Sequence, residues 1–465
     1  MWYRRALVCI VAIAILVAWW LFHDTYRRHA GLPVGGLEIR FAHFGSHEDY
    51  EFWRGVIADF ERDHTGTRIH QEYTIGPGDQ YDINMRRQFL SDRPPDVALI
   101  HLTQFRELAE NFEDLGEFVE GAPRRNIEGS AEQKKRPSLF ADPHPTFIHV
   151  LEPTGLKAFQ IGDAQRGLPV SGRNLLIYVN RKCFERAARF HNRPVPLPAD
   201  DWTIEDFIRT AEMLTCDFDR DGRIDQFGFR LPRWVYYLPF IWSFGAEVTD
   251  ADTARWTLAG PKAEAALWFY RRLATGDRVC PHEEEVPQLL QDTGFLTGRI
   301  AMCVNGPWFM SFLDKTDLAD SYAVAPIPRG PGGRATLITW DGAVMKKGLP
   351  PDRRDIASRF IESMLSREVQ DRLARSGRAL PARTESQSAF IAPDESRRRP
   401  FVEAVSYSRL QPILPNFDAL ERIIDRHLAD AADPTRPFRA DAILDALARE
   451  PDIARTFARL ENKSP

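Results

Sequence analysis

Apolar runs that end in aromatic and polar side chains are the features of this chain that could most clearly bind a ligand. The run from Ile300 to Val304 is stopped by Asn305-Gly306-Pro307, which delivers Trp308 just beyond its end. Ligands bind at strand ends in α/β sheets, and an indole face is a platform for a sugar ring or a cation. Asn305 and Trp308 are therefore candidate binding residues, and a purely structural Trp308 is the alternative.

A second indole lies beside a carboxylate. Trp340 and Asp341 end the apolar run from Ala335 to Thr339. This pair suits a sugar, because the ring stacks on its C–H face while the acid accepts two hydroxyl hydrogens. The alternative is that Asp341 caps the following turn.

Polar side chains also follow the first two strands along the chain. Leu37 to Ala42 alternates apolar and polar residues, which predicts a strand, and Asp96 to His101 predicts a buried one. The candidate residues at these two strand ends are Phe44, Ser46, His47, Glu48, His101 and Thr103. A lone histidine at a strand end is also commonly a structural residue, so that interpretation of His101 stays open.

Two arginines and one aromatic cluster complete the candidates. Arg173 and Arg378 each follow a glycine and could donate a planar fork to a ligand, with a salt bridge as the alternative. The cluster from Trp234 to Trp242 has helical spacing, so most of it should be core. We expect either Tyr237 or Trp242 to reach a ligand.

An Asp-rich turn has the oxygen spacing of a calcium loop. Its carboxylates are Asp217, Asp219, Asp221 and Asp225. An EF-hand would place a bidentate glutamate at the twelfth position, where Gly228 stands. A solvated Asx-rich turn is the alternative, so we expect no cofactor other than this weak calcium candidate.

Composition limits the function classes. The 465 residues suffice for two domains, and 43% hydrophobic with 27% charged residues is typical of a globular protein. The net charge of -5 gives no basic surplus, so nucleic-acid binding is not expected. Cys183, Cys216, Cys280 and Cys303 lack metal spacing, which favours buried thiols over a metal site, while disulfide pairing stays open.

The N-terminal residues indicate export. Arg4 and Arg5 precede an unbroken apolar run from Ala6 to Phe22. This run is long for a signal-peptide core and is at the short limit of a membrane-spanning helix, and no small-residue cleavage site follows it. We therefore expect residues 1–30 to be an uncleaved transmembrane anchor, with the rest of the chain on the periplasmic side. A cleaved signal peptide is the alternative.

Several segments occur in the same order as in bacterial periplasmic solute-binding proteins of sugar ABC transporters, and the chain resembles this maltose-binding-protein-like family over roughly Leu37 to Arg383. Besides VNGPW at Val304, the segments are LEIRFAHFGSHEDYEFWRGVIADFERDHTG from Leu37, PPDVALIH from Pro94, GLPVSGRNLLIYVNRKCF from Gly167, DWTIEDFIRTAEMLT from Asp201, DRDGRIDQFGF from Asp219, YYLPFIWSFGAEV from Tyr236, ATLITWDGAVMKKG from Ala335 and SGRALPAR from Ser376.

The resemblance implies an α/β, two-lobed periplasmic binding protein fold of type II. Each lobe would be a mixed, mainly parallel sheet flanked by helices, with the ligand cleft between the lobes. Three hinge crossings would divide the chain into residues 37–172 plus 342–377 (lobe 1) and 173–341 plus 378–465 (lobe 2). Several short connections permit bending but little twist, so the lobes would close on a ligand.

The implied function is a monomeric, non-catalytic receptor that captures a carbohydrate and presents it to ABC permease subunits in the inner membrane. Maltose-binding relatives carry Trp and acidic residues after the second strand, where this chain has Ile100-His101-Leu102-Thr103, so that specificity does not transfer. Two other classes stay open. One is a membrane-anchored sensing module that signals to a partner protein. The other is a glycan-cleaving enzyme, for which only Glu48 and Asp341 are candidate carboxyl groups.

Overall fold

The computed structural model of the chain describes residues 36–75, 78–91, 93–116, 149–249, 256–276, 278–281, 292–412, 417–451 and 453. The predicted anchor, residues 1–30, lies outside these ranges. Within them, no helix combines the length and apolar character that a membrane span requires.

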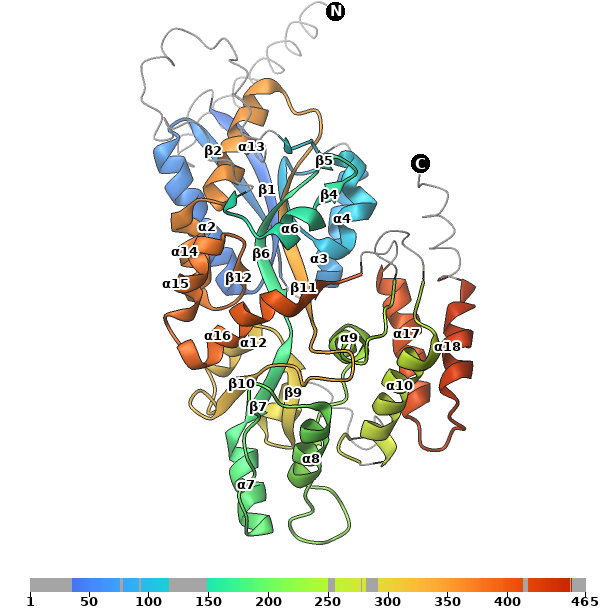
Figure 1. Cartoon of the computed structure of the whole chain (residues 1–465). Helices are drawn as coiled ribbons and strands as arrows, with labels where there is room; N and C mark the ends of the chain where they lie inside the picture. Colours follow the sequence, from blue (N-terminus) through green and yellow to red (C-terminus); the bar gives the residue numbers. More distant parts are fainter. Residues whose placement is uncertain are drawn as a thin grey trace, which may run out of the picture.

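Two sheets form the centres of two lobes, one above the other in Figure 1. In the described residues the upper sheet has seven strands in the order β12-β6-β11-β3-β1-β2, with β13 paired to β11, and the lower sheet has the order β10-β7-β9-β8. The upper strands are β1 (Leu37–Gly45), β2 (Thr67–Ile75), β3 (Val97–His101), β6 (Leu168–Asn174), β11 (Thr336–Met345), β12 (Leu380–Pro381) and β13 (Ser408–Leu410). The lower strands are β7 (Leu176–Asn180), β8 (Phe227–Phe229), β9 (Ile300–Asn305) and β10 (Tyr322–Ala325). A small hairpin pairs β4 (Gln160–Ile161) with β5 (Ala164–Gln165).

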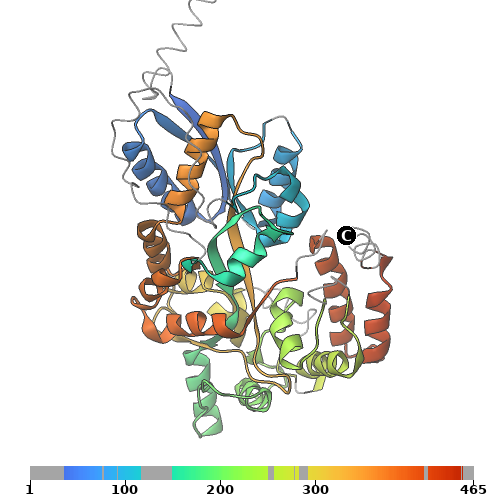
Figure 2. The same cartoon turned by 45° about the horizontal axis from the view of Figure 1, so that its top comes forward.

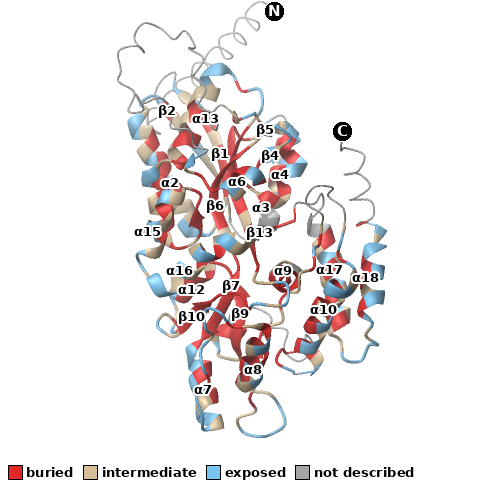
Figure 3. Cartoon of the chain, in the orientation of Figure 1, coloured by how far each residue is buried: buried red, intermediate tan, exposed pale blue. Residues whose placement is uncertain are grey.

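Helices cover both sheets, and the strands between them are largely buried (Figure 3). The upper lobe carries α2 (His47–Asp63), α3 (Gly78–Phe89), α4 (Leu102–Leu108), α6 (Pro153–Ala158) and α13 (Pro351–Met364). The lower lobe carries α7 (Arg181–His191), α8 (Ile204–Leu214), α9 (Trp234–Ser243), α10 (Gly260–Arg271), α11 (Asp292–Leu296), α12 (Trp308–Leu313), α17 (Phe417–Ala432) and α18 (Ala440–Ala448). A third group consists of α14 (Arg367–Ser376), α15 (Gln387–Ile391) and α16 (Glu395–Ala404). Figure 2 shows α14, α15 and α16 on the opposite side of the molecule from α10, α17 and α18.

Local sequence signals set the helix starts that matter for the site. Ser46 caps α2 and forms a capping box with Asp49, while Trp53, Val56 and Phe60 on its inner face are buried. Thr203 and Asp206 have the three-residue spacing that is typical of a capping box, and they form one at the start of α8.

The hinge region differs from the sequence prediction in two respects. The sequence from Gly167 to Asn180 favours one strand that runs towards the other lobe, but this strand is interrupted at Leu175, and β6 and β7 belong to different sheets. The prediction of two mainly parallel sheets is wrong for the lower lobe, where β7 runs antiparallel to both β9 and β10 and only β8 pairs with β9 in parallel. The reason is topological: β7 continues directly from β6 and not from a crossover helix of its own lobe.

Two large apolar cores correspond to the two lobes. Along the crossing strands the packing changes from the upper to the lower core between Val170 and Leu175, and between Ile338 and Leu337. A third, smaller core joins β7, β9 and α12 to α14, α15 and α16. The chain therefore passes between the lobes near the middle of the molecule, where the polar clusters described below lie.

Candidate functional site

A buried carboxylate in the upper sheet is held by three neighbours, and we call this group the Asp341 cluster. Asp341 Oδ1 lies 2.8 Å from His101 Nδ1, and Oδ2 accepts a hydrogen bond from Ser171 Oγ at 3.0 Å and contacts Arg173 Nη1. The strands β3, β11 and β6 bring these residues together, and the register of β11 against β6 shifts at Asp341 and Gly342. Such an irregularity redirects side chains, which is common near functional sites.

The Asp341 carboxylate is held in its charged form, and its partners His101 and Arg173 remain partly accessible. Burial alone would raise the pKa of Asp341, but Arg173 and His101 outweigh it and hold the pKa at about 2. The Asp341 side chain is 3% exposed, whereas His101 and Arg173 are 23% and 21% exposed. The Phe44 ring lies 4.3 Å from the His101 ring. The surface that this cluster offers a solute therefore consists of an arginine donor and an imidazole nitrogen beside an aromatic ring.

A second group on the upper lobe, the Glu48 cluster, surrounds the start of α2. Arg378 Nη2 donates to Ser46 Oγ at 2.6 Å and also contacts Asp49, while its Nη1 lies 3.9 Å from Glu48 Oε2. Glu48 Oε1 is 2.5 Å from Lys315 Nζ, which belongs to the lower lobe just after α12. The hydrogen bond from Lys315 is the largest cause that lowers the pKa of Glu48 to about 2.

A third group, the Asp292 cluster, lies on the lower lobe at the ends of β8 and β9. Asp292 Oδ1 is 2.9 Å from Arg230 Nη1 and accepts a hydrogen bond from Asn305 Nδ2 at 3.3 Å. Arg230 also donates to the Val304 carbonyl at 3.3 Å. The Asp292 side chain is 45% exposed, so this carboxylate can still accept hydrogen bonds from outside.

Trp308 follows this cluster and keeps part of its ring surface accessible. A Cβ atom added at Gly306 would lie 2.0 Å from the ring, so only glycine permits the indole to fold back over the turn. Tyr178 fixes the same turn by donating its hydroxyl to the Gly306 carbonyl at 2.7 Å. The ring is half-buried between the lower and third cores. The predicted delivery of Trp308 just beyond a strand end is confirmed as local structure.

The three clusters converge on the chain crossings. Asn305 pairs with Leu176 at the start of β7, three residues after Arg173, and β12 lies beside Gly172 just after Arg378. Thr103 is half-buried in the first turn of α4, and His47 is exposed beside Glu51.

Three of the predicted aromatic contacts are core residues. The Trp340 ring is 0% exposed in the middle of β11 and packs against Gly172 and Gly155, because the strand continues to Met345 and does not end at Asp341. Trp242 is 3% exposed and lies in the lower core. Tyr237 is 1% exposed and donates its hydroxyl to the Ala266 carbonyl.

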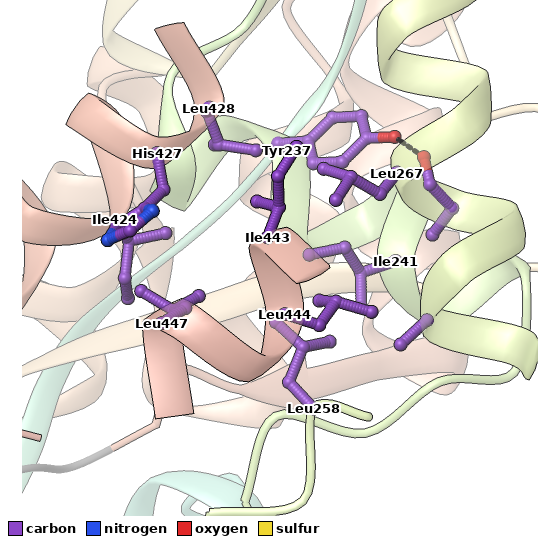
Figure 4. Close-up of a pocket in the computed structure, with 12 residues that line it drawn as sticks. Tyr237, Ile241, Leu258, Leu267, Ile424, His427, Leu428, Ile443, Leu444 and Leu447 are labelled. Atoms are coloured by element: carbon purple, nitrogen blue, oxygen red, sulfur yellow. Dashed lines mark hydrogen bonds between the residues drawn. The ribbon is translucent and has the colours of Figure 1, made fainter. Parts of the chain in front are cut away.

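Tyr237 also lines an apolar cavity between α9, α10, α17 and α18 (Figure 4). The cavity has room for about 20 Å³, which is the space of one water molecule, and its other lining groups include Ile241, Leu267 and Leu444. It is too small for a sugar ring and is a packing void of the lower lobe.

The Asp-rich turn brings three carboxylates together. One oxygen each of Asp217, Asp219 and Asp225 lies within 4.8 Å of the others, so these residues could hold a metal ion. Backbone N–H groups already donate to them, for example from Gly222 to Asp217 at 2.8 Å. The calcium interpretation stays a prediction. The four described cysteines are free and buried, and burial raises the pKa of Cys183 to about 12.

Sequence reasoning missed Arg230, Asp292 and Lys315. Arg230 directly follows the strand that ends at Phe229, so the strand-end rule applied to Trp308 would have found it. Asp292 begins α11, 62 residues from Arg230, and no local pattern indicates their pairing. Lys315 meets Glu48 across 267 residues, and only the tertiary structure shows it.

Residues 44–371 match the family model of bacterial extracellular solute-binding proteins. This match covers more than half of the chain, so the chain belongs to that family. Membership implies an extracytoplasmic location, and it agrees with the two lobes described above.

Comparisons with individual proteins are more distant. Binding proteins of Brucella abortus (strain 2308) and Brucella suis biovar 1 (strain 1330) are each 20% identical over 288 residues, which are 60% of this chain and 67% of the relative. An ABC substrate-binding protein of Listeria monocytogenes in complex with cycloalternan superposes with a TM-score of 0.73 at 18% identity, covering 91% of this chain and 99% of that chain. The GacH receptor of Streptomyces glaucescens, solved unliganded and with acarbose, gives 0.70 at 16% identity, with 92% and 100% covered. Maltose-bound MalE3 of T. maritima gives 0.68 at 17% identity, with 90% and 100% covered. These likenesses establish the two-lobed fold.

Proposed function

We propose that this protein captures a carbohydrate, a sugar or an oligosaccharide, by closing its lobes and delivers it to an ABC transporter permease in the inner membrane. The observation that carries the proposal is the Asp292 cluster, which joins an accessible carboxylate, an arginine and the amide of Asn305, three residues before the half-buried Trp308. Three structural neighbours support it, since they were solved with cycloalternan, acarbose and maltose bound.

The chemistry of the two lobes suits a neutral polyhydroxy solute. Asp292 can accept hydroxyl hydrogens while Trp308 stacks on an apolar C–H face. Beside Phe44, Arg173 can donate to ring or hydroxyl oxygens, and the remaining ring nitrogen of His101 can accept a hydroxyl hydrogen when the ring is neutral or donate when it is charged. Asp341 is balanced by Arg173 and Asp292 by Arg230, so neither of these two clusters selects for a net charge on the solute.

The lobes proposed for this closure are residues 37–172 plus 342–377 and residues 173–341 plus 378–465. The change of core along β6–β7 and β11 supports crossings near the first two boundaries. We further propose a monomer that is tethered to the cytoplasmic membrane by residues 1–30, whose apolar run from Ala6 to Phe22 supports the tether. A tethered sensor that signals to a partner protein is the alternative use of the same fold.

Glycan cleavage has less support. A glycosidase needs a general acid whose pKa is raised so that it is protonated near neutral pH. Lys315 lowers the pKa of Glu48, and Arg173 lowers that of Asp341, so both carboxyl groups are held ionised. Both are also engaged by protein cations, which leaves neither in the state that acid catalysis requires.

The proposal is tested by a thermal-shift screen of the full chain against mono- and oligosaccharides, polyols and phosphodiesters. A carbohydrate at 100 times its dissociation constant should add about 2.7 kcal/mol to the free energy of unfolding and raise the melting temperature. Trp308→Ala should abolish the rise, whereas Trp268→Ala, which removes an exposed indole on α10, should retain it. Stabilisation by phosphodiesters alone, or an equal response of both variants, would contradict the proposal.

A further inference from the structure

The Glu48–Lys315 ion pair connects the two lobes. Glu48 lies in the first turn of α2, which packs on the upper core through Trp53 and Phe60. Lys315 follows α12, and its backbone N–H donates to the Phe312 carbonyl of that helix at 3.2 Å. Lys315 Nζ and Glu48 Oε1 are 2.5 Å apart. The pair therefore joins α2, which packs on the upper core, to the residue that follows α12 on the lower lobe.

Contacts other than the one with Lys315 also hold the Glu48 carboxylate in place. Ser46 Oγ donates to Glu48 Oε2 at 2.5 Å, and the Ser46 hydroxyl is itself bound by Arg378. Arg378 follows Gly377 at the end of α14, whose residues Val369 and Ala374 contribute to the upper and third cores. An exposed ion pair is commonly weak because two long side chains must be ordered, but here one partner is already fixed within a network.

We propose that Glu48 and Lys315 form a latch that holds the lobes in the described arrangement when no solute is bound. Lys315 is thereby a positioning residue that sets the population of this arrangement and, through it, the solute affinity. The inference rests on the lobe closure of the proposed function, but it concerns the solute-free protein. Because the pair is 62% and 53% exposed, salt should weaken it.

The test measures the distance between the lobes by pulsed electron spin resonance on the full chain without solute. Spin labels are attached to cysteines introduced at Leu90 and Leu197, whose side chains are 83% and 40% exposed on the upper and lower lobes. Cys9→Ser serves as the background, and the four cysteines of the described lobes are buried. The variants are Glu48→Gln, Lys315→Gln and the charge swap Glu48→Lys with Lys315→Glu. Glu51→Gln is the matched control, because Glu51 pairs with Arg54 within α2.

Each single variant should reduce the population at the wild-type distance by about two- to fivefold relative to other distances, the range expected for an exposed pair. The charge swap should restore part of that population, because the new cation at position 48 also faces Arg378, while Glu51→Gln should leave it unchanged and 0.5 M salt should reproduce the effect of Lys315→Gln. A distribution that is the same in every variant would overturn the latch, as would a change in Glu48→Gln alone, which would assign the effect to Ser46 and Arg378. The rise in melting temperature with carbohydrate, measured separately on the same proteins, would show whether the proposed function holds even if the latch does not.

Discussion

Charge balance among single residues decides what the candidate site can offer a solute. Asp341 is enclosed by Arg173, His101 and Ser171, so its carboxylate serves the protein. Asp292 faces Arg230 on one side but remains 45% exposed on the other. The two acids look equivalent as partners of arginines, yet burial commits the first to the protein, and exposure leaves the second free for the binding role proposed above.

We predict that Asp341→Asn lowers the free energy of unfolding by about 2–3 kcal/mol at pH 7, because it leaves Arg173 without a counter-charge and removes a carboxyl whose pKa is held at about 2. The folded-state pKa lies below the unfolded value, so the stabilisation is complete above about pH 4. It is lost as pH falls from 4 through 2. Urea denaturation of both proteins across this range measures the difference.

The control is Asp355→Asn, which breaks a half-buried ion pair with Arg359 within α13 and should cost about 1 kcal/mol or less. An Asp341→Asn deficit that stays constant from pH 7 to pH 2 would show that the variant acts by packing and not by charge.

Single residues also show how far the sequence identifies the site. Trp308 and Asn305 are predictable because a buried strand and a turn precede them in the chain. Tyr237 and Trp242 have helical spacing, which predicts burial but not whether the ring faces the core or the ligand. The pairing of Arg230 with Asp292 comes from the tertiary structure, so local sequence carries no signal for it.

At the scale of elements, close packing between neighbouring strands shapes the hinge. Gly172 on β6 lies opposite Trp340 on β11, and a Cβ atom at position 172 would be 2.8 Å from the indole ring. Helix starts such as Ser46 and Thr203 are visible in the sequence, because a cap and its acidic partner are three residues apart. The break at Leu175 is not visible, because the chain stays extended on both sides of it and only the choice of sheet changes.

We predict that Gly172→Ala destabilises the protein by about 1–3 kcal/mol, because the added methyl group overlaps the Trp340 ring. In a Trp340→Phe background the smaller ring leaves room for the methyl group, so the cost of Gly172→Ala should fall by at least half. A double-mutant cycle from urea denaturation measures this coupling. Equal costs in both backgrounds would mean that the strand backbone, and not the ring, limits position 172.

At the scale of the whole molecule, the division into separate upper and lower cores permits the lobes to move relative to each other. Two crossings, the β6–β7 segment and β11, pass from one core to the other, and the third core packs α14, α15 and α16 against the lower strands. The family segments in the sequence predict this two-lobed plan. They do not predict that the lower sheet is mainly antiparallel, because strand direction there depends on how β7 enters the lobe from the hinge.

The most direct test of carbohydrate capture by lobe closure is the distance between labels at positions 90 and 197, measured as a carbohydrate from the screen is added. We expect a saturable shift to a single shorter distance between the labels. Trp308→Ala should move the midpoint of this shift to at least about tenfold higher carbohydrate concentration, because stacking on the indole is lost. A distribution that does not change at saturating carbohydrate would contradict capture by lobe closure.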